Sequence, residues 1–425
     1  MKKIVTPGKK DWKRILQRPV QDASLLSDRV KDILQDVKMN GDAAIKKYSQ
    51  QFDKIAVDQL KVSQEEIVKA VNSVTPSLRR AIETAASNIR FFHEQQRQTP
   101  VIVETMPGVK CWKKPVAIDK VGLYIPGGTA PLFSTVLMLG IPAGIAGCRE
   151  VVLASPPGQD GNIHPVILFA ANLVGVTSIF KVGGAQAIAA MAYGTATIPA
   201  VYKIFGPGNQ YVDCAKQCVQ QDGVGIDMPA GPSEVCVMAD ETCDPSFVAA
   251  DLLSQAEHGT DSQVLLVCTH ERIADQVLLE IGNQTTNLSR GTIIAETLKN
   301  SHAVIMDDKS EMIEFVNEYA PEHLIIAMND AEAIAGKIVN AGSVFIGNYT
   351  PESAGDYASG TNHVLPTNGF AKSYSGVSVD SFVKMITFQQ ITKEGLQTIG
   401  ETIQQMALAE GLDAHGNAVT LRLMK

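Results

Sequence analysis

Two polar side chains three residues apart, Gln255 and His258, could bind one metal ion together. They lie in DPSFVAADLLSQAEHG, a segment that predicts a helix with Asp244 as its N-cap and Gly259 after its last turn. Residues three apart share a helix face, so both side chains could reach one ion. The spacing is also that of a surface glutamine and of a histidine interacting with the helix C-terminus, and spacing alone favours this second interpretation.

Glu322 and His323 are adjacent in YAPEHLIIAM, where a predicted helix ends and a predicted strand begins. A carboxylate beside an imidazole offers two proton acceptors on a connection at a sheet edge. Histidine titrates near neutral pH, and burial can raise the pKa of a glutamate toward the same range. The pair is therefore a candidate acid–base centre, and a solvent-exposed turn is equally compatible with the pattern.

The segment PESAGDYASGTNHVLPTNG mixes polar and small residues, which predicts a binding loop. Its candidate side chains are Glu352, Asp356 and His363. Glu410 and His415 follow near the C-terminus. With His258 and Asp356 they could complete a metal site, because zinc accepts imidazole and carboxylate ligands. The separations along the chain do not by themselves identify such a site.

From about residue 116, short hydrophobic runs that end in Gly or Pro alternate with helical segments, which predicts parallel α/β sheets. The first series predicts five strands of one doubly wound sheet: VGLYIPGG, EVVLASPPG, SIFKVGGAQ, YKIFGPGN and GIDMPAGPS. A second series begins at Asp244 and predicts the strands QVLLVCT, HAVIMDD, LIIAM and SVFIG. The matched order of elements indicates two similar halves, although no repeat of residue identity is present.

The ends of the predicted strands are the expected place for a ligand. Standard nucleotide fingerprints such as G-x-G-x-x-G are absent. Even so, runs that end in Gly-Gly or Gly-Pro-Gly let a backbone approach a ligand at the carboxyl edge of a sheet, where open α/β folds bind ligands. We expect a ligand crevice there, with plain tight turns as the alternative.

The overall expectation is an α/β protein with two Rossmann-like, doubly wound parallel-sheet domains. Helical periodicity over 13–95 adds a helical N-terminal region, and a helix over 392–410 precedes a polar tail that is too short for its own core. The expected domains are 1–110, a helical region packing on the second α/β lobe; 111–235, the first Rossmann-like domain; 236–370, the second; and 371–425, a C-terminal extension.

Composition and charge exclude several classes of protein. The 425-residue chain has a net charge of −8 and spreads its Lys and Arg thinly after its first 50 residues, so it offers no basic face for nucleic acid. Residues 121–148 carry no charge, but repeated glycines and prolines argue against a membrane span. No hydrophobic signal follows the basic N-terminus, so we expect a cytoplasmic protein. Seven cysteines without a C-x-x-C pair predict reduced core cysteines.

Several of these segments, taken in order, resemble the histidinol dehydrogenase family. They are YIPGGTAPLFSTVLML, KVGGAQAIAAMAYGT, KIFGPGN, IDMPAGPSEV, DLLSQAEHG, YAPEHL and TNHVLPT, with LDAHGNAVTLR in the tail. The resemblance covers about residues 121–366 and the C-terminus, whereas residues 1–110 contribute little to it.

The resemblance implies one zinc ion per subunit. Its ligands would be Gln255, His258, Asp356 and His415, with His415 coming from the partner subunit of an intertwined homodimer. The ion would hold the imidazole and amino nitrogens of L-histidinol. A tail that reaches across the dimer would also explain why this short segment lacks a core.

The same resemblance implies the remaining contacts and the reaction. Histidinol would be held by the zinc ligands, by His323, and by Ser233, His363 and Glu410. NAD would contact Tyr124, Gln186 and Asn209, all on strand-end turns of the first series, the NAD side of the protein. The implied activity is a four-electron, NAD-dependent oxidation through bound histidinal, the last step of histidine biosynthesis, with His323 as base for both hydride transfers and Glu322 activating water.

Two other functions are compatible with parts of the pattern. Two α/β lobes around a cleft also describe a non-catalytic amino-acid-binding protein, which would bind its ligand without forming NADH. A zinc hydrolase could use Glu322 to activate water, but it would leave the glycine-rich strand ends unexplained.

Overall fold

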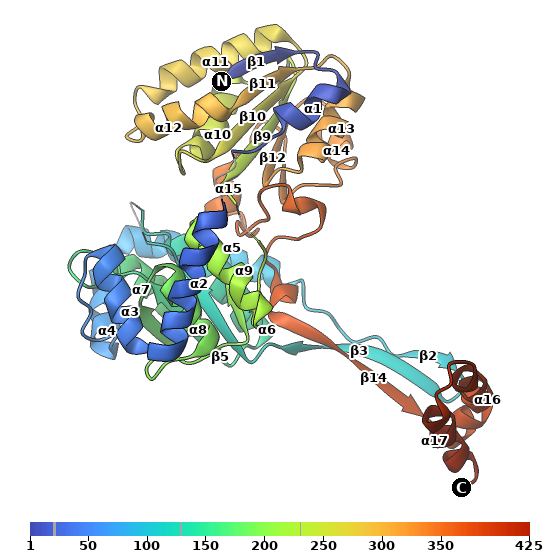
Figure 1. Ribbon diagram of the computed structural model, residues 1–425. Helices are drawn as coiled ribbons and strands as arrows, with labels where there is room; N and C mark the ends of the chain where they lie inside the picture. The colour runs from blue at the N-terminus through green and yellow to red at the C-terminus, as the bar shows by residue number, and fades with distance from the viewer. Residues whose placement is uncertain (20–22, 128–129, 230) are drawn as a thin grey trace.

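The computed structural model describes residues 1–19, 23–127, 130–229 and 231–425. Two α/β lobes lie one above the other in Figure 1, and a long ribbon-like arm leaves the first lobe and ends in a pair of helices. Gly128 and Ala230, which fall in two of the predicted strand-end turns, lie outside the described residues.

The first lobe contains the parallel sheet that the first hydrophobic series predicts. Its strands, in spatial order, are β6 (Ser178–Lys181), β5 (Glu150–Ser155), β4 (Lys120–Tyr124), β7 (Lys203–Phe205) and β8 (Gly225–Ile226). The helices that connect them are α6 (Phe133–Ala146), α7 (Pro165–Val174), α8 (Gly184–Tyr193) and α9 (Gln210–Gln221). Helices α6 and α7 pack on one face of the sheet, and α8 and α9 pack on the other.

The second lobe contains a six-stranded parallel sheet. Its strands, in spatial order, are β1 (Lys2–Val5), β11 (His302–Ile305), β10 (Gln263–Cys268), β9 (Glu234–Ala239), β12 (His323–Ala327) and β13 (Ser343–Ile346). One face is covered by α10 (Pro245–Ala256), α11 (Glu271–Thr285) and α12 (Gly291–Thr297). The other is covered by α1 (Lys9–Ile15), α13 (Lys309–Tyr319) and α14 (Ala331–Ala335).

The two sheets share one topology. Numbered within its own lobe, each has the strand order 3-2-1-4-5, and the second carries β1 as an additional edge strand. The expectation of two doubly wound halves is confirmed. Two strands of the second sheet were not predicted: β9, a fully buried strand at its centre that is apolar after Glu234, and β1, a short edge strand with two lysines.

The N-terminal helices pack mainly on the first lobe, so the expectation that residues 1–110 pack on the second lobe is wrong for most of that region. Helices α2 (Ala23–Asn40) and α3 (Asp42–Tyr48) pack against α8 and α9, while α4 (Gln64–Ser73) and α5 (Pro76–Glu94) pack against α7 and α6. Among the described residues of this region, β1, α1 and the segment after α1 that carries Arg18 join the second lobe. Helical periodicity shows which face of a helix is apolar, but it does not show which partner covers that face.

The arm combines segments from both halves of the sequence (Figure 1). Strand β3 (Val109–Ala117) pairs antiparallel with β14 (Val383–Ile391) on one side and with β2 (Val103–Met106) on the other. Residues 103–110 are thus part of the arm and not of a helical region. The arm ends in α16 (Lys393–Ala409), which confirms the expected helix, and in α17 (Asp413–Leu423), where a polar tail was expected. The two helices pack against each other.

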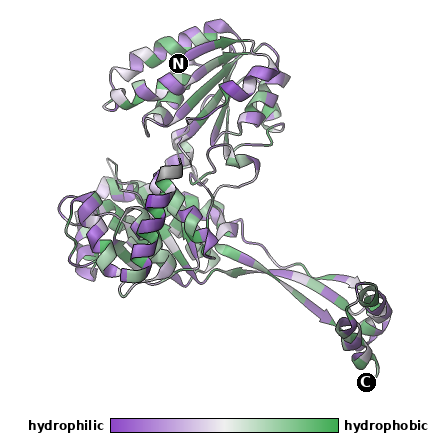
Figure 2. Cartoon of the chain, in the orientation of Figure 1, coloured by the Kyte–Doolittle hydropathy of each residue, from purple (hydrophilic) through white to green (hydrophobic). Residues whose placement is uncertain are grey.

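Hydrophobic residues line the strands of both parallel sheets, and the outer helices turn hydrophilic faces to solvent (Figure 2). The uncharged stretch that begins at residue 121 forms β4 and the buried helix α6. Within the described ranges, no helix is long and hydrophobic enough to cross a membrane.

Candidate active site

Glu322 and His323 lie at the start of β12, at the amino edge of the second sheet. Helix α13 ends at Ala320, whose φ of 52° places it in the left-handed region, and Pro321 prevents the helix from continuing. The exposed fractions of Glu322 and His323 are only 7% and 3%. The solvent-exposed turn that the sequence left open is therefore not what this segment forms.

The backbone of Glu234, the first residue of β9, holds both members of this pair. Its N–H donates to Oε2 of Glu322 at 2.8 Å, and its carbonyl oxygen lies 3.2 Å from Nδ1 of His323. Because a carbonyl oxygen can only accept, Nδ1 of His323 carries the hydrogen, which leaves Nε2 to accept a proton from a substrate.

The side chain of Glu234 fixes this strand end in turn. It forms an ion pair with Arg18, whose Nη2 donates to Glu234 Oε2 at 2.9 Å and to the carbonyl oxygen of Tyr319 at 2.7 Å. Arg18 thereby ties the N-terminal segment, the start of β9 and the end of α13 together.

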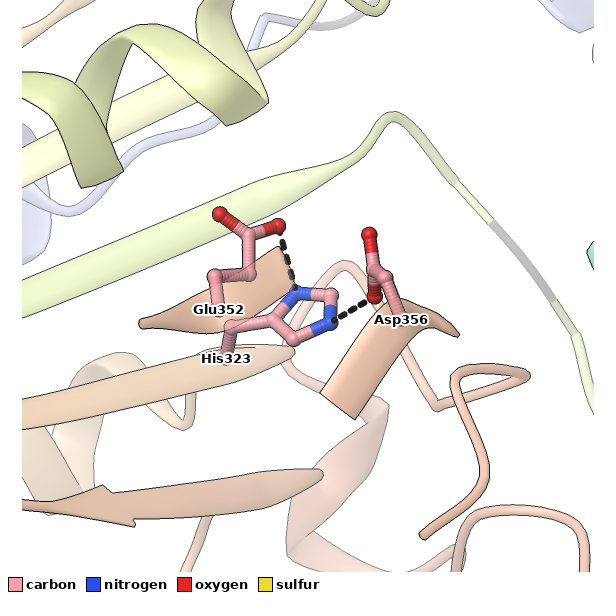
Figure 3. Close-up of side chains that lie close together, drawn as sticks. All are labelled: His323, Glu352 and Asp356. Carbon is pink, nitrogen blue, oxygen red and sulfur yellow. Dashed lines mark ion pairs between the residues drawn. The ribbon is translucent and has the colours of Figure 1, made fainter. Parts of the chain in front are cut away.

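Two further carboxylates face His323 (Figure 3). Nδ1 lies 3.7 Å from Oε1 of Glu352, and Nε2 lies 3.6 Å from Oδ1 of Asp356. Both carboxylates come from α15 (Glu352–Tyr357), and Glu352 also accepts a hydrogen bond from Ser254 Oγ at 2.7 Å. The sequence placed Glu352 in a binding loop without giving it a role, because nothing in the pattern indicates that its side chain is almost fully buried.

These contacts shift the protonation equilibria of the buried pair. Burial opposes a charged imidazole, but Glu322, Glu352 and Asp356 outweigh that effect and raise the pKa of His323. Burial also raises the pKa of Glu322, although the charge of His323 opposes this change. The carboxylates thus stabilise the imidazolium that forms when His323 accepts a proton.

Three of the four predicted zinc ligands come from this region. Gln255, near the end of α10, donates through Nε2 to Glu322 at 3.2 Å, while its Oε1 is buried without a partner among the described residues. His258 Nδ1 lies 3.4 Å from the hydroxyl of Ser233, and the charge of Asp356 acts on the His258 imidazole. An amide oxygen, an imidazole and a carboxylate form a donor set that fits zinc.

His363 connects this region to the first lobe. Its Nδ1 lies 2.9 Å from the carbonyl oxygen of Asp356, and its Nε2 lies 3.1 Å from Oγ1 of Thr135 on α6. Since α6 begins beyond the carboxyl end of β4, this contact brings the carboxyl edge of the first sheet next to the amino edge of the second.

Glu410 and His415 do not join the other candidate residues within one chain. Both are exposed, at the end of α16 and in α17, and these helices lie at the far end of the arm (Figure 1).

The three predicted NAD contacts lie together in the first lobe, where Tyr124, Gln186 and Asn209 line one cavity of about 1290 Å³. The Tyr124 hydroxyl accepts a hydrogen bond from the N–H of Gly184 at 3.1 Å, at the start of α8. Asn209 is the N-cap of α9 and accepts from the N–H groups of Tyr211 and Val212. The predicted crevice at the carboxyl edge is therefore present.

A buried ion pair between Lys216 and Asp227 fixes the turn that carries Asn209. Lys216 donates to the carbonyl oxygen of Gly206 at 3.0 Å, and Asp227 accepts from the N–H of Gly206 at 2.8 Å. Gly206 has a φ of 127°, and a Cβ there would lie 2.1 Å from the Tyr124 carbonyl oxygen. Only glycine fits this position, so the turn is held tightly against β4.

The histidinol dehydrogenase family model matches residues 16–423 of this chain. The chain belongs to the histidinol dehydrogenase family. It is 57% identical to the histidinol dehydrogenase of Bacteroides thetaiotaomicron, over all of this chain and 99% of that protein. It is 53% identical to the chloroplastic histidinol dehydrogenase of Arabidopsis thaliana, over 96% of this chain and 87% of that protein.

A solved structure agrees with this membership. The crystal structure of histidinol dehydrogenase from Elizabethkingia anophelis is 54% identical in sequence and superposes with a TM-score of 0.98, covering 100% of this chain and 98% of that one. The family membership makes this chain an oxidoreductase of histidine biosynthesis, and the two-lobed α/β fold is that of the family.

Proposed function

We propose that this enzyme oxidises L-histidinol to L-histidine in two steps at one site, through bound L-histidinal, with NAD as the oxidant. One alcohol, one water and two NAD⁺ give one carboxylate, two NADH and three protons. The observation that carries the proposal is the buried Glu322–His323 pair, whose two acceptors are held by the backbone of one strand end. Oxidation of the alcohol and activation of water both need a proton acceptor, and the two side chains supply one for each kind of step.

In the first oxidation, Nε2 of His323 accepts the hydroxyl proton of histidinol while the hydride of the carbinol carbon passes to NAD⁺. The three neighbouring carboxylates favour this step because they stabilise the resulting imidazolium. Glu322 then accepts a proton from the water that adds to the aldehyde, while the imidazolium of His323 returns its proton to the aldehyde oxygen, so that the hydrate forms and Nε2 is free to accept again. The hydrate transfers its hydride to a second NAD⁺, and His323 again accepts the hydroxyl proton.

The proposed zinc ligands are Gln255, His258, Asp356 and His415 of the partner subunit. The unpartnered Oε1 of Gln255 supports this assignment, because a buried acceptor without a donor is costly unless a ligand satisfies it. When bound, zinc would anchor the imidazole and amino nitrogens of the substrate and so orient its alcohol end. Ser233, His363 and Glu410 would complete the substrate contacts.

The arm supports a homodimer with shared active sites. It carries Glu410 and His415 away from the other candidate residues of their own chain, so a second subunit must supply them if they act at this site. The C-terminal extension would thus be the part that reaches the partner. No property of the chain requires nucleic acid or a membrane for this reaction, and we propose that it takes place in the cytoplasm.

The first lobe is the proposed NAD domain and the second the zinc and catalytic domain. Helices α8 and α9 begin at the carboxyl edge of the first sheet, beside Gln186 and Asn209. Helix N-termini favour anions, and the pyrophosphate of NAD is an anion. The contact between Thr135 and His363 brings the two lobes together. NAD in the first lobe could therefore accept a hydride from a substrate held in the second.

The test is the amount of NADH formed per histidinol consumed, measured before and after treatment with a chelator. We expect a ratio of about two, as four electrons require two NAD, and loss of activity after chelation that added zinc restores. A ratio near one would contradict the four-electron oxidation.

Mixing two inactive variants tests the shared site. His323→Ala and His415→Ala subunits should regain up to about one quarter of the wild-type activity, because half of randomly mixed dimers are mixed and each then holds one intact site. Verified mixed dimers without activity would exclude the crossover.

A further inference from the structure

Asp53 presents an unpaired carboxylate oxygen beside the proposed NAD cavity. It is the last residue of η1 (Ser49–Asp53), which follows α3, and its side chain lines the cavity together with Phe52 and Ile55. Its Oδ2 is shielded from solvent and has no hydrogen-bond partner in the described part of the chain. A shielded carboxylate oxygen without a donor is costly, which indicates a ligand that supplies one.

The electrostatic surroundings of Asp53 include no cation, among the described residues, that pairs with its carboxylate. Burial raises the pKa of Asp53, and no positive charge among the described residues offsets that effect. Arg29 and Lys69 line the same cavity, but neither donates a hydrogen bond to Oδ2 of Asp53. Burial and, to a smaller degree, the charge of Asp53 raise the pKa of Tyr124 to about 12, so the carboxylate lies near one of the proposed NAD contacts.

The position of Asp53 identifies the half of the dinucleotide that it would meet. The nicotinamide must approach the substrate next to His323 and α15, in the second lobe. Helix α3, which leads into η1, lies on the side of the first lobe away from α15 (Figure 1). The end of the cavity beside η1 is therefore left for the adenosine half.

We propose that Asp53 accepts hydrogen bonds from the ribose hydroxyls of the adenosine half of NAD and thereby excludes the 2′-phosphorylated cofactor NADP. This inference rests on the proposed use of NAD. An ionised carboxylate only accepts hydrogen bonds, which suits hydroxyl donors, whereas a 2′-phosphate would place a second negative group against it. Open α/β dinucleotide sites use an acidic residue of their own sheet for this task. In this protein the acidic residue would come from the N-terminal helical region instead of from the sheet of the first lobe.

The test measures direct binding of NADH, NADPH and 2′-deoxy-NADH to the full-length enzyme by cofactor fluorescence. Asp53→Asn is compared with Asp58→Asn, a matched control because Asp58 is exposed and does not line the cavity. We expect Asp53→Asn to weaken NADH binding by about 10-fold, the value of one hydrogen bond to a charged group, and to reduce the preference for NADH over NADPH. Asp58→Asn should bind all three cofactors like the wild type.

The 2′-deoxy cofactor tests the contact without a mutation. The wild type should bind it more weakly than NADH, and Asp53→Asn should discriminate less between the two, as expected for groups that interact directly. Equal wild-type affinity for NADH and 2′-deoxy-NADH, or an unchanged NADH-to-NADPH preference in a folded Asp53→Asn enzyme, would overturn this inference alone. A wild type that does not bind NADH would overturn the proposed function as well.

Discussion

The two lobes share a strand order but use opposite ends of their sheets. In the first lobe the cavity lies at the carboxyl edge, where α8 and α9 begin. In the second lobe Glu322 and His323 lie at the amino edge, where α10 and α13 end. Because helices begin at one edge of such a sheet and end at the other, the two sites have different electrostatic environments.

The difference matches the charge of what each lobe is proposed to bind. Helix N-termini expose N–H groups and favour anions such as a pyrophosphate, whereas helix C-termini expose carbonyl groups and favour cations. At the first edge, the amides of Gln186 and Asn209 and the hydroxyl of Tyr124 lie beside the starts of α8 and α9. The second presents buried carboxylates around one imidazole. One topology thus offers two kinds of site, according to which edge is used.

The largest expected effect is on chemistry in the second lobe. His323→Ala should slow histidinol oxidation by about 100-fold to 10,000-fold, the usual contribution of a general base. The affinity for NADH, measured by direct binding, should stay at the wild-type value because the cavity is in the other lobe. A parallel loss of NADH binding would contradict the separation of the two sites.

The next effect is on stability in the first lobe. Lys216→Met leaves Asp227 buried without its partner and should lower the free energy of unfolding by about 3–5 kcal/mol, measured by denaturant titration. The control is Lys372→Met, which removes the exposed pair with Glu318 and should cost less than about 1 kcal/mol. The folded Lys216→Met enzyme should also bind NADH more weakly, because the turn before Asn209 loses its support. Similar losses of stability in both variants would show that the buried pair does not fix this turn.

A smaller effect, which depends on whether the enzyme oxidises or reduces its substrate, is expected for Glu322. Glu322→Gln should slow the oxidation of added histidinol and histidinal by about 100-fold, the lower value for an acid–base group. Reduction of histidinal to histidinol needs no water activation, so it should stay near the wild-type rate in steady-state assays. Equal loss in all three reactions would exclude separate tasks for the two bases.

The smallest effect concerns Asp251, which lies on α10 one turn before Gln255. Burial raises the pKa of Asp251 to about 6, so its carboxyl group holds a proton more strongly in the folded state than in the unfolded state. The stability gained from protonation is present below about pH 4 and is lost as the pH rises through 6. Asp251→Asn should therefore stabilise the protein by about 1–3 kcal/mol at pH 7.5 and leave it unchanged at pH 4. Equal shifts in denaturant midpoint at both pH values would contradict this origin.

The sequence predicted the first sheet well because each of its strands ends in a glycine or proline that interrupts a hydrophobic run. It did not predict β9, whose six buried residues show no alternation and follow Pro229, Gly231 and Pro232 in the sequence. The arm was also missed, since β3 pairs with a strand more than 250 residues away and local periodicity carries no information on such pairing.

The candidate site also has a part that the sequence predicted and a part that it did not. Adjacent residues such as Glu322 and His323 stand out in the sequence, and the Gln255–His258 spacing follows from one helix. The proximity of Glu352 to His323, and the support of both bases by the Glu234 backbone, depend on how β9, β12 and α15 meet in space. The resemblance to a family linked the separate candidates, and the contacts that hold them became visible only in the structure.

The edge strand β1 has a consequence for how this protein is made. Lys2 lies opposite His302, about 300 residues later in the chain. At roughly 5–20 residues per second, the ribosome needs roughly 15–60 s to supply that partner. Strand β1 must therefore wait for its partner while the helices behind it already dock on a different lobe. A bulky N-terminal fusion should consequently disturb the late-forming catalytic lobe more than the helices that follow it directly in sequence.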